Sequence, residues 1–163
     1  MTLEIRRALH SDAAKMINAH RRSIREICFK DYSPEQIEAW AGHDFREDHW
    51  HKTMDKDLVW VISDSASNVY GFGHLKLRAN SEAEVAGLYF APEVVGKGLG
   101  KKMMAMIFDE CRQKEVKTLS LCATKTAKAF YESVGFQQQG PASTIDLGGQ
   151  KLECYNMANE DLG

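Results

Sequence analysis

The sequence predicts one α/β (α+β) domain, with a central sheet of about seven strands flanked by helices. Three observations predict it. The length of 163 residues suits one domain with a full core. Short apolar runs with the two-residue period of strands alternate with runs of helical period. No linker, internal repeat or low-complexity segment divides the chain, so we expect the domain to span residues 1–163.

Composition and charge are those of an ordinary soluble globular protein. Hydrophobic residues make up 44% of the sequence and charged residues 27%. The net charge is -2, with both signs interspersed, which argues against nucleic acid as the main partner. No apolar run approaches the ~20 residues of a membrane span, and the first residues lack an apolar signal segment. We therefore expect a cytoplasmic protein with no membrane partner.

The first half of the chain is predicted to hold one strand and two or three helices. Leu3 and Ile5 alternate with charged residues and indicate a strand over residues 2–8. Ser11 is the expected N-cap of a helix over residues 12–27, whose apolar positions recur at intervals of three and four.

A second helix has a strong start signal. Ser33 is the expected cap, Pro34 takes the first helical position, and Gln36 completes a capping box. The polar residues 43–51 indicate a further short helix with Asp44 near its cap. The three histidines of that stretch lack the fixed spacing of a metal site, so we expect no metal.

Strands dominate the centre of the chain. Residues 58–62 and 69–77 read as a hairpin around a small polar turn. Residues 84–90 form the next strand, and Gly87 within it indicates a bulge or a close backbone approach.

The last third alternates helices and strands. A helix follows the central strand and runs to about Lys114, and a strand follows it. The next helix ends at Gly135, as a glycine at a helix C-terminus predicts. Two strands close the sheet. The expected ranges are strands 118–123, 136–139 and 151–157, helix 124–134 and a turn at 148–149.

The cysteines indicate reduced thiols. They are widely separated and form no C-x-x-C pair. Cys122 lies in an apolar run, so a buried core thiol is expected there rather than a nucleophile. The four are Cys28, Cys111, Cys122 and Cys154.

The most informative stretch runs from Leu88 to Met104. It reads as an apolar strand, a tight turn, a glycine-spaced loop and an amphipathic helix. Gly96, Gly98 and Gly100 alternate directly before the helix. Glycine lets the backbone approach a ligand closely, and the first helical amides lack partners and attract negative charge. The stretch therefore predicts an anion cradle, most often for phosphate.

Two common phosphate motifs do not fit this loop. The Walker A pattern fails because Val95 replaces its first glycine and Lys102 replaces its Ser or Thr. The dinucleotide fingerprint fails because its third glycine comes one residue early. A glycine loop that merely connects strand and helix is the alternative without a ligand.

Two segments resemble the GNAT acetyltransferase superfamily. Residues 95–100 resemble its motif A, Q/R-x-x-G-x-G/A, with Val95 in place of the leading Gln or Arg. Residues 127–136 resemble motif B, A-x-x-F-Y-x-x-x-G-F, at every fixed position, and Thr124 stands where an Asn is common. Two motifs in the right order and at the usual separation are more specific than either alone.

The resemblance implies the GNAT fold, with a mixed, mostly antiparallel sheet. It also implies acetyl-CoA as a co-substrate, held in a V between the strands of residues 88–90 and 119–121, where strand amides pair with pantetheine. The residues expected to bind it are Leu88, Tyr89, Phe90, Val95, Gly96, Lys97, Gly98, Leu99, Gly100, Lys101, Thr124 and Lys128.

The implied reaction is direct attack of an amine in a ternary complex. An amine with a pKa near ~10 is only about 0.1% free base at pH 7, so a proton acceptor is needed. The leaving thiolate benefits from a proton. Tyr131 is the expected acid, because the family tyrosine at this place protonates the CoA sulfur; a core aromatic is its alternative role. Glu84 is the expected base, with Glu82 and His74 in reserve.

The acceptor amine is expected to be a small molecule or a protein, and selectivity should come from the first helices and the loop before Glu84. Homodimers are frequent in the family, and no residue here identifies one. A CoA-binding sensor or scaffold with the same fold and little turnover is the alternative function. Plausible wall residues of the acceptor site are Asp31, Tyr32, Glu35, Trp40 and Trp50.

Overall fold

The computed structural model describes residues 1–162 and contains one eight-stranded sheet. The strand order is β1-β2-β3-β4-β5-β8-β6, and β7 pairs with β8 outside this path. Of the pairs formed, β4 with β5 is parallel and the others are antiparallel. The expected mixed, mostly antiparallel sheet is confirmed. The strands are β1 Glu4–Arg7, β2 Leu58–Ser63, β3 Val69–Leu77, β4 Glu82–Phe90, β5 Thr118–Thr124, β6 Gln137–Gln138, β7 Ser143–Leu147 and β8 Gln150–Asn159.

The eighth strand is β7, which the sequence analysis did not predict. It is mostly exposed and pairs only through β8, from Ser143 with Cys154 to Leu147 with Gln150. An exposed edge strand carries little apolar periodicity, so its sequence gives a weak signal. The turn expected at residues 148–149 connects β7 to β8.

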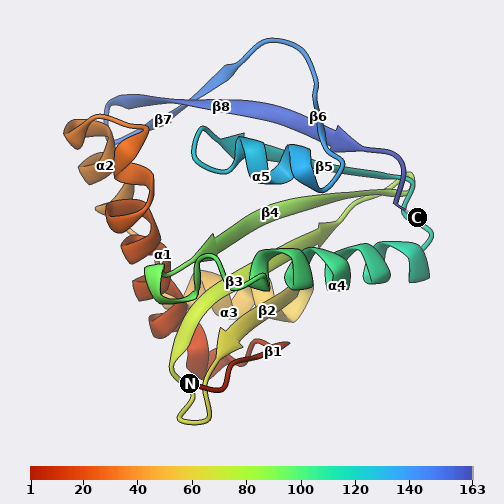
Figure 1. Ribbon diagram of the computed structural model, residues 1–163, viewed down its shortest axis with the longest axis horizontal. Helices are drawn as coiled ribbons and strands as arrows, with labels where there is room; N and C mark the ends of the chain where they lie inside the picture. Colours follow the sequence, from red (N-terminus) through yellow and green to blue (C-terminus); the bar gives the residue numbers. More distant parts are fainter. Residues whose placement is uncertain (163) are drawn as a thin grey trace.

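Helices cover both faces of the sheet (Figure 1). Buried residues of α4 and α5, such as Met103 and Tyr131, pack against one face, together with Leu88 of β4. Met16 of α1 packs against the other face with Val59 and Phe72, and α3 lies behind the sheet in Figure 1. The helices are α1 Ala13–Glu26, α2 Pro34–Ala41, α3 Glu47–Lys56, α4 Leu99–Gln113 and α5 Lys128–Ser133.

The helix starts agree only in part with the predicted caps. The capping box of α2 is confirmed: Ser33 N donates to Gln36 Oε1 over 2.8 Å, and Gln36 N donates to Ser33 Oγ over 3.1 Å. Ser11 as a cap is wrong, because it lies inside a short 3-10 turn before α1, where the Asp12 carboxylate accepts the bond from Leu9 N.

The cap expected for α3 is also wrong. Asp44 precedes the helix, which starts at Glu47 with Arg46 at the N-cap position. Phe45, between them, packs its side chain against the cluster around Trp40, so tertiary packing keeps this segment outside the helix. The expected helix over residues 124–134 is likewise shorter, because residues up to Thr124 still belong to β5.

The strands β4 and β5 separate partway along their length. Their register runs from Glu82 opposite Thr118 to Val85 opposite Leu121 and ends there, although β4 continues to Phe90. Figure 1 shows the two strands close together at one end and far apart at the other. Beyond Val85, the edge of β4 that faces β5 pairs with no strand of residues 1–162. The parting strands produce the V expected from the resemblance.

The bulge expected at Gly87 is confirmed. His74 of β3 pairs with Gly87, whereas Leu75 pairs with Val85, so Ala86 is the extra residue on β4. A Cβ at Gly87 would lie 3.3 Å from the ring of Phe72, so the aromatic packing there also favours glycine.

Cys122 is exposed, and the prediction that it is a buried core thiol is wrong. Alternate residues of a strand point to opposite faces. Leu119, Leu121 and Ala123 point into the core, so Cys122 points away from it. It also lies beyond Leu121, the last residue of β5 that pairs with β4. The other three cysteines are buried.

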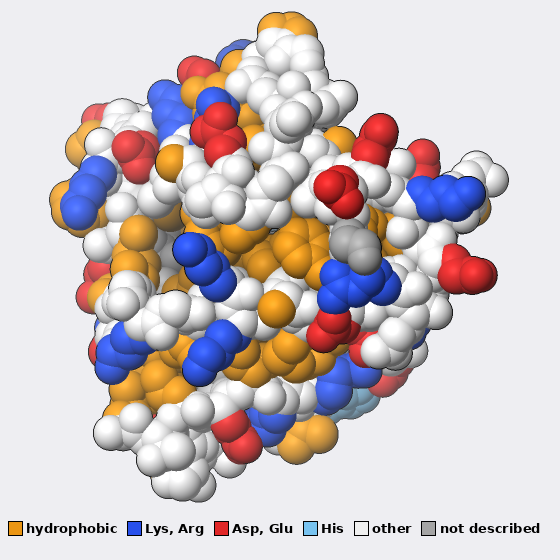
Figure 2. Space-filling view, turned by 45° about the vertical axis from the view of Figure 1, so that its right-hand side comes forward, with side chains coloured by type: hydrophobic (Ala, Val, Ile, Leu, Met, Phe, Trp, Pro, Cys, Tyr) orange, Lys and Arg blue, Asp and Glu red, His pale blue; other side chains and the backbone are white. Residues whose placement is uncertain are grey.

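Charges of both signs are interspersed over the face turned forward in Figure 2, which also carries an apolar hollow near its centre. No helix within residues 1–162 is long and apolar enough to cross a membrane.

Candidate functional site

The glycine loop leads directly into α4. Gly96 and Gly98 have φ angles of +80° and +76°, and Gly98 is the N-cap residue of the helix. An L side chain resists such angles, which explains glycine at both places. A Cβ added at either would meet no atom within 4 Å, so the backbone here faces open space. The first turn of α4 carries no acidic residue. Unscreened amides at the start of a 15-residue helix suit a phosphate group.

Gly100 has a different role from the one its motif implies. A Cβ there would lie 3.1 Å from the ring of Phe130, so the small residue lets α5 pack closely against the start of α4. The packing of Phe130 joins the two motifs in space. They are thirty residues apart in the sequence and only the fold brings them together.

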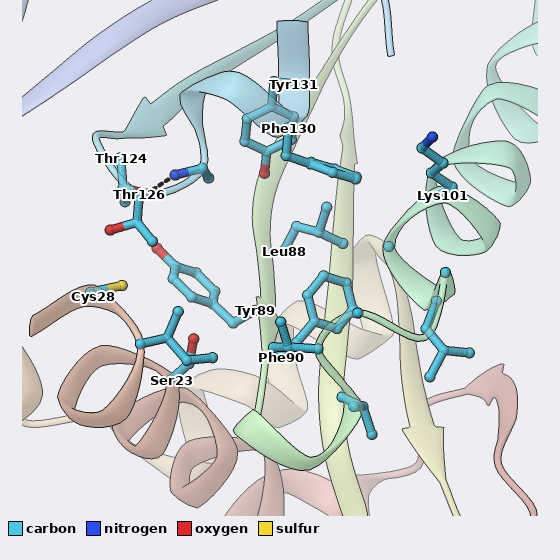
Figure 3. Close-up of a pocket in the computed structure, with 18 residues that line it drawn as sticks. Ser23, Cys28, Leu88, Tyr89, Phe90, Lys101, Thr124, Thr126, Phe130 and Tyr131 are labelled. Carbon is cyan, nitrogen blue, oxygen red and sulfur yellow. Dashed lines mark hydrogen bonds between the residues drawn. The ribbon is translucent and has the colours of Figure 1, made fainter. Parts of the chain in front are cut away.

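A cavity of about 460 Å³ opens between the parted strands, the glycine loop and α5 (Figure 3). Most of the residues expected to bind the co-substrate line it. Lys97 and Lys128 do not; the ammonium of Lys128 pairs with Glu132. The expected residues that line this first cavity are Leu88, Tyr89, Phe90, Val95, Gly96, Gly98, Leu99, Gly100, Lys101, Thr124 and Tyr131.

Several lining residues were not predicted. Phe130 stands in the second motif but was not assigned to the site. Thr126 also lines the cavity, and its hydroxyl donates to Asp31 over 2.7 Å. Ser23 and Cys28 come from the N-terminal helical region, and no sequence pattern relates that region to the glycine loop.

Tyr131 extends from α5 into the first cavity. Its ring lies between those of Phe130 and Phe136, at centroid distances of 5.5 and 5.7 Å. Its hydroxyl points toward the strand that carries Leu88 (Figure 3). The residue is only 6% exposed, and burial raises the pKa of the phenol. The side chain therefore belongs to the core through its ring and keeps its proton at neutral pH.

Thr124 ends β5 at the rim of the same cavity. Its hydroxyl accepts a hydrogen bond from the Ala127 amide over 3.2 Å, which fixes the turn into α5 (Figure 3). A threonine here can hold the turn and still face the cavity, which it lines.

Glu84 lies outside the first cavity. It stands on β4 before the bulge, and its carboxylate pairs with Arg78. Its side chain is 28% exposed. Of the two reserves, Glu82 is exposed, whereas His74 is buried and lines a second cavity.

The second cavity, of about 470 Å³, is lined by residues from α1, α3, β3, β4 and the loop before α3. The two cavities meet along β4. Gly87 lines the second, Leu88 lines the first, and Tyr89 lines both. The ring of Tyr89 lies 4.0 Å from that of His20.

Two of the imidazoles that line the second cavity, those of His20 and His74, have lowered pKa values. Burial lowers the pKa of His20 to about 3, helped by the nearby charges of Arg21 and His43. His20 Nε2 is buried and has no hydrogen-bond partner within residues 1–162. Burial also lowers the pKa of His74, against the opposing effect of its 2.7 Å bond to Asp57 Oδ2. At neutral pH the His74 Nε2–H donates to Asp57, which leaves Nδ1 as a proton acceptor.

Of the wall residues expected for the acceptor site, Trp50 lines the second cavity. Trp40 and Tyr32 are buried in a separate cluster, where the Tyr32 hydroxyl donates to Glu153 O and accepts from Lys125 N. Glu35 is exposed. Within residues 1–162, no three His, Cys, Asp or Glu side chains are grouped so as to hold a metal ion.

Comparison with known sequences gives a consistent result. A family model described as acetyltransferase (GNAT) domain matches residues 28–146. The chain is 29% identical over 152 residues to the uncharacterized N-acetyltransferase YafP of Escherichia coli (strain K12), covering 93% of this chain and 87% of that protein. It is 28% identical over 109 residues to the spermidine N(1)-acetyltransferase of Thermoplasma acidophilum, and this match covers 64% of this chain and 67% of that protein.

Solved structures share the fold. A GCN5-related N-acetyltransferase from Rhodopseudomonas palustris superposes with a TM-score of 0.85 at 23% identity, covering 98% of this chain and 96% of that one. The PaiA N-acetyltransferase of Thermoplasma acidophilum, solved in complex with coenzyme A, gives a TM-score of 0.81 at 22% identity, covering 98% and 99%.

Proposed function

Because the chain belongs to the GNAT acetyltransferase family, we propose that it transfers the acetyl group of acetyl-CoA to an amine by direct attack in a ternary complex. The observation that carries the proposal is the first cavity, in which the glycine loop, the open edge of β4 and the Tyr131 hydroxyl face one space. A phosphate cradle alone would suit many ligands. A cradle joined to an apolar channel and a buried proton donor suits a long thioester.

The residues present fit acetyl-CoA. The amides at Gly96, Gly98 and the start of α4 would hold the pyrophosphate, because a Cβ at either glycine would meet no atom within 4 Å and the helix dipole favours anions. The unpaired edge of β4 at Leu88 and Phe90 would bond the pantetheine amides as a neighbouring strand does. Val95, which is 54% exposed, offers only its backbone there.

Acetyl-CoA supplies an acetyl group activated as a thioester. The neutral amine forms a C–N bond to the carbonyl carbon while the C–S bond breaks, giving an N-acetyl amine and CoA thiol. Tyr131 donates its proton to the departing sulfur, and its raised pKa keeps that proton available at neutral pH. The proton that the nitrogen loses as the C–N bond forms restores the Tyr131 hydroxyl. The earlier proton, that of the incoming ammonium, goes to a base on the acceptor side.

Two residues are proposed for that base. Glu84 would act through a water molecule, because its carboxylate is held by Arg78 and lines neither cavity. His74 lines the second cavity beside the bulge, and Asp57 orients its ring. A base must lie within reach of its proton, directly or through one water. This requirement favours His74.

The proposal is tested first by thermal denaturation with acetyl-CoA, CoA or ATP. A ligand at a hundred times its dissociation constant adds roughly 2.7 kcal/mol to the free energy of unfolding, which should raise the melting temperature by about 5–10 °C. We expect this shift with acetyl-CoA and not with ATP, together with amine-dependent release of CoA thiol.

The other outcomes separate the alternatives. A shift with acetyl-CoA but no thiol release with any amine would favour the CoA-binding sensor or scaffold. No shift at all, at concentrations well above any plausible dissociation constant, would contradict both functions.

A further inference from the structure

The lining of the second cavity indicates what kind of amine it accepts; this inference rests on the proposed function. We propose that the second cavity binds the acceptor, and that the acceptor is a primary amine on an aromatic or apolar body with no second positive charge. The cavity meets the first one at the β4 bulge, where Gly87 and Leu88 are consecutive residues. An amine at Gly87 would therefore face the acetyl group held beside Leu88.

Aromatic rings form a continuous wall in the cavity. Trp50 lies edge-on to Phe72 at a centroid distance of 5.0 Å, and Phe72 lies 5.7 Å from Tyr89. The ring of His20 lies 4.0 Å from that of Tyr89 and 4.7 Å from that of Phe45, centroid to centroid. Such a wall favours a flat or apolar ligand, since aromatic pairs gain from offset and edge-on contacts as well as from buried area. One ammonium can also lie against these rings by cation–π attraction.

The charges around the cavity do not suit a polyamine. Asp57, the buried carboxylate near it, is already bonded to His74. Asp44 is the carboxylate among the lining residues, and it is exposed. Arg46 of the same rim is paired with Asp48 over 3.3 Å. A ligand with three or four ammonium groups needs several carboxylates to replace its hydration, and one exposed aspartate does not supply them.

The polar groups inside suit a single amine. His74 Nδ1 can take one proton from the ammonium, since Asp57 holds the opposite ring nitrogen. His20 Nε2 is buried and has no hydrogen-bond partner in the described part of the chain, residues 1–162. Both imidazoles belong to the lining and neither carries charge at neutral pH.

The test compares 2-phenylethylamine with spermidine as acceptors for acetyl-CoA. We expect kcat/KM for 2-phenylethylamine to exceed that for spermidine at least tenfold. Phe45→Ala should then raise the KM for 2-phenylethylamine about three- to tenfold, the loss expected for one aromatic contact. Phe29→Ala is the matched control, because Phe29 is 52% exposed and lines neither cavity.

A binding measurement makes the test independent of turnover. Titration calorimetry of 2-phenylethylamine into CoA-saturated protein should show the same loss for Phe45→Ala and none for Phe29→Ala. If Phe45→Ala does not fold, Phe45→Leu keeps the apolar volume while removing the ring. Preference for spermidine, no binding of 2-phenylethylamine, or unchanged binding in the Phe45 variants would overturn the inference. An intact acetyl-CoA melting shift in those cases would leave the proposed cofactor standing.

Discussion

The ring of His20 lies 4.0 Å from the ring of Tyr89, centroid to centroid, and joins α1 to the strand that borders both cavities. His20 Nε2 is buried without a hydrogen-bond partner within residues 1–162. A buried, uncharged imidazole packed against the half-buried ring of Tyr89 is costly for the protein to protonate. The stability of the fold and the shape of the second cavity therefore depend on the same neutral side chain.

The first prediction concerns pH and stability. The folded pKa of His20, about 3, is below the unfolded value of about 6.5, so its contribution is fully present above pH ~6.5 and is lost as the pH falls toward the folded value. Between pH 7 and 5 the free energy of unfolding of the wild type should fall by up to about 2 kcal/mol more than that of His20→Gln. Well below pH ~6.5 this difference should grow by ~1.4 kcal/mol per pH unit.

Urea denaturation at both pH values measures this difference. His10→Gln is the matched control, because the His10 side chain is 52% exposed. Parallel stability curves for the wild type and His20→Gln would show that His20 is not the group responsible.

The second prediction separates ligand approach from backbone strain at Gly98. Gly98→Ala and Gly149→Ala place a side chain at nearly equal φ angles, +76° and +80°, with open space around both. Each should cost about 1–2 kcal/mol of stability. Only Gly98→Ala should lose the melting shift with acetyl-CoA, because its methyl group faces the first cavity. Equal shifts in the two variants would contradict a phosphate cradle at this loop.

The third prediction concerns the proton donor. Tyr131→Phe keeps the ring packed between Phe130 and Phe136 and removes only the hydroxyl. We expect kcat to fall about 10²-fold, within the range of general acid catalysis, while the acetyl-CoA melting shift stays. Tyr70→Phe is the control, because its hydroxyl bonds to Asp64 and the residue lines neither cavity. Full activity in Tyr131→Phe would show that the hydroxyl is not the proton donor and that Tyr131 serves only as a core aromatic.

The fourth prediction distinguishes the two bases. His74→Gln should lower kcat at least 10²-fold, whereas Glu84→Gln should lower it less than about tenfold. In the wild type, the acidic limb of kcat/KM should lie below pH ~6.5, since burial lowers the pKa of His74, and His74→Gln should abolish that limb. A larger loss of kcat in Glu84→Gln than in His74→Gln would identify Glu84 as the general base.

Local features of the fold could be predicted because they depend on nearby residues. The capping box at Ser33 needs only residues three apart. The left-handed turn at Gly98 follows from glycine's conformational freedom, and a glycine inside a strand marked the place of the bulge at Gly87. For the same reason the sequence alone predicted the glycine loop and the helix after it. It also singled out Tyr131, which lines the first cavity. Most residues expected to bind the co-substrate do line one cavity.

Only the tertiary structure decided which side chains face which space. Cys122 is exposed because β5 leaves β4 after Leu121, and Glu84 is paired because Arg78 lies across the turn from it. The second cavity takes residues from four elements and a loop, and no spacing in the sequence relates them. The sequence thus determined the pattern of helices and strands and the glycine loop, because these depend on residues close together in the chain. Packing between distant elements determined the second cavity, because burial and hydrogen-bond partners there come from residues far apart in the chain.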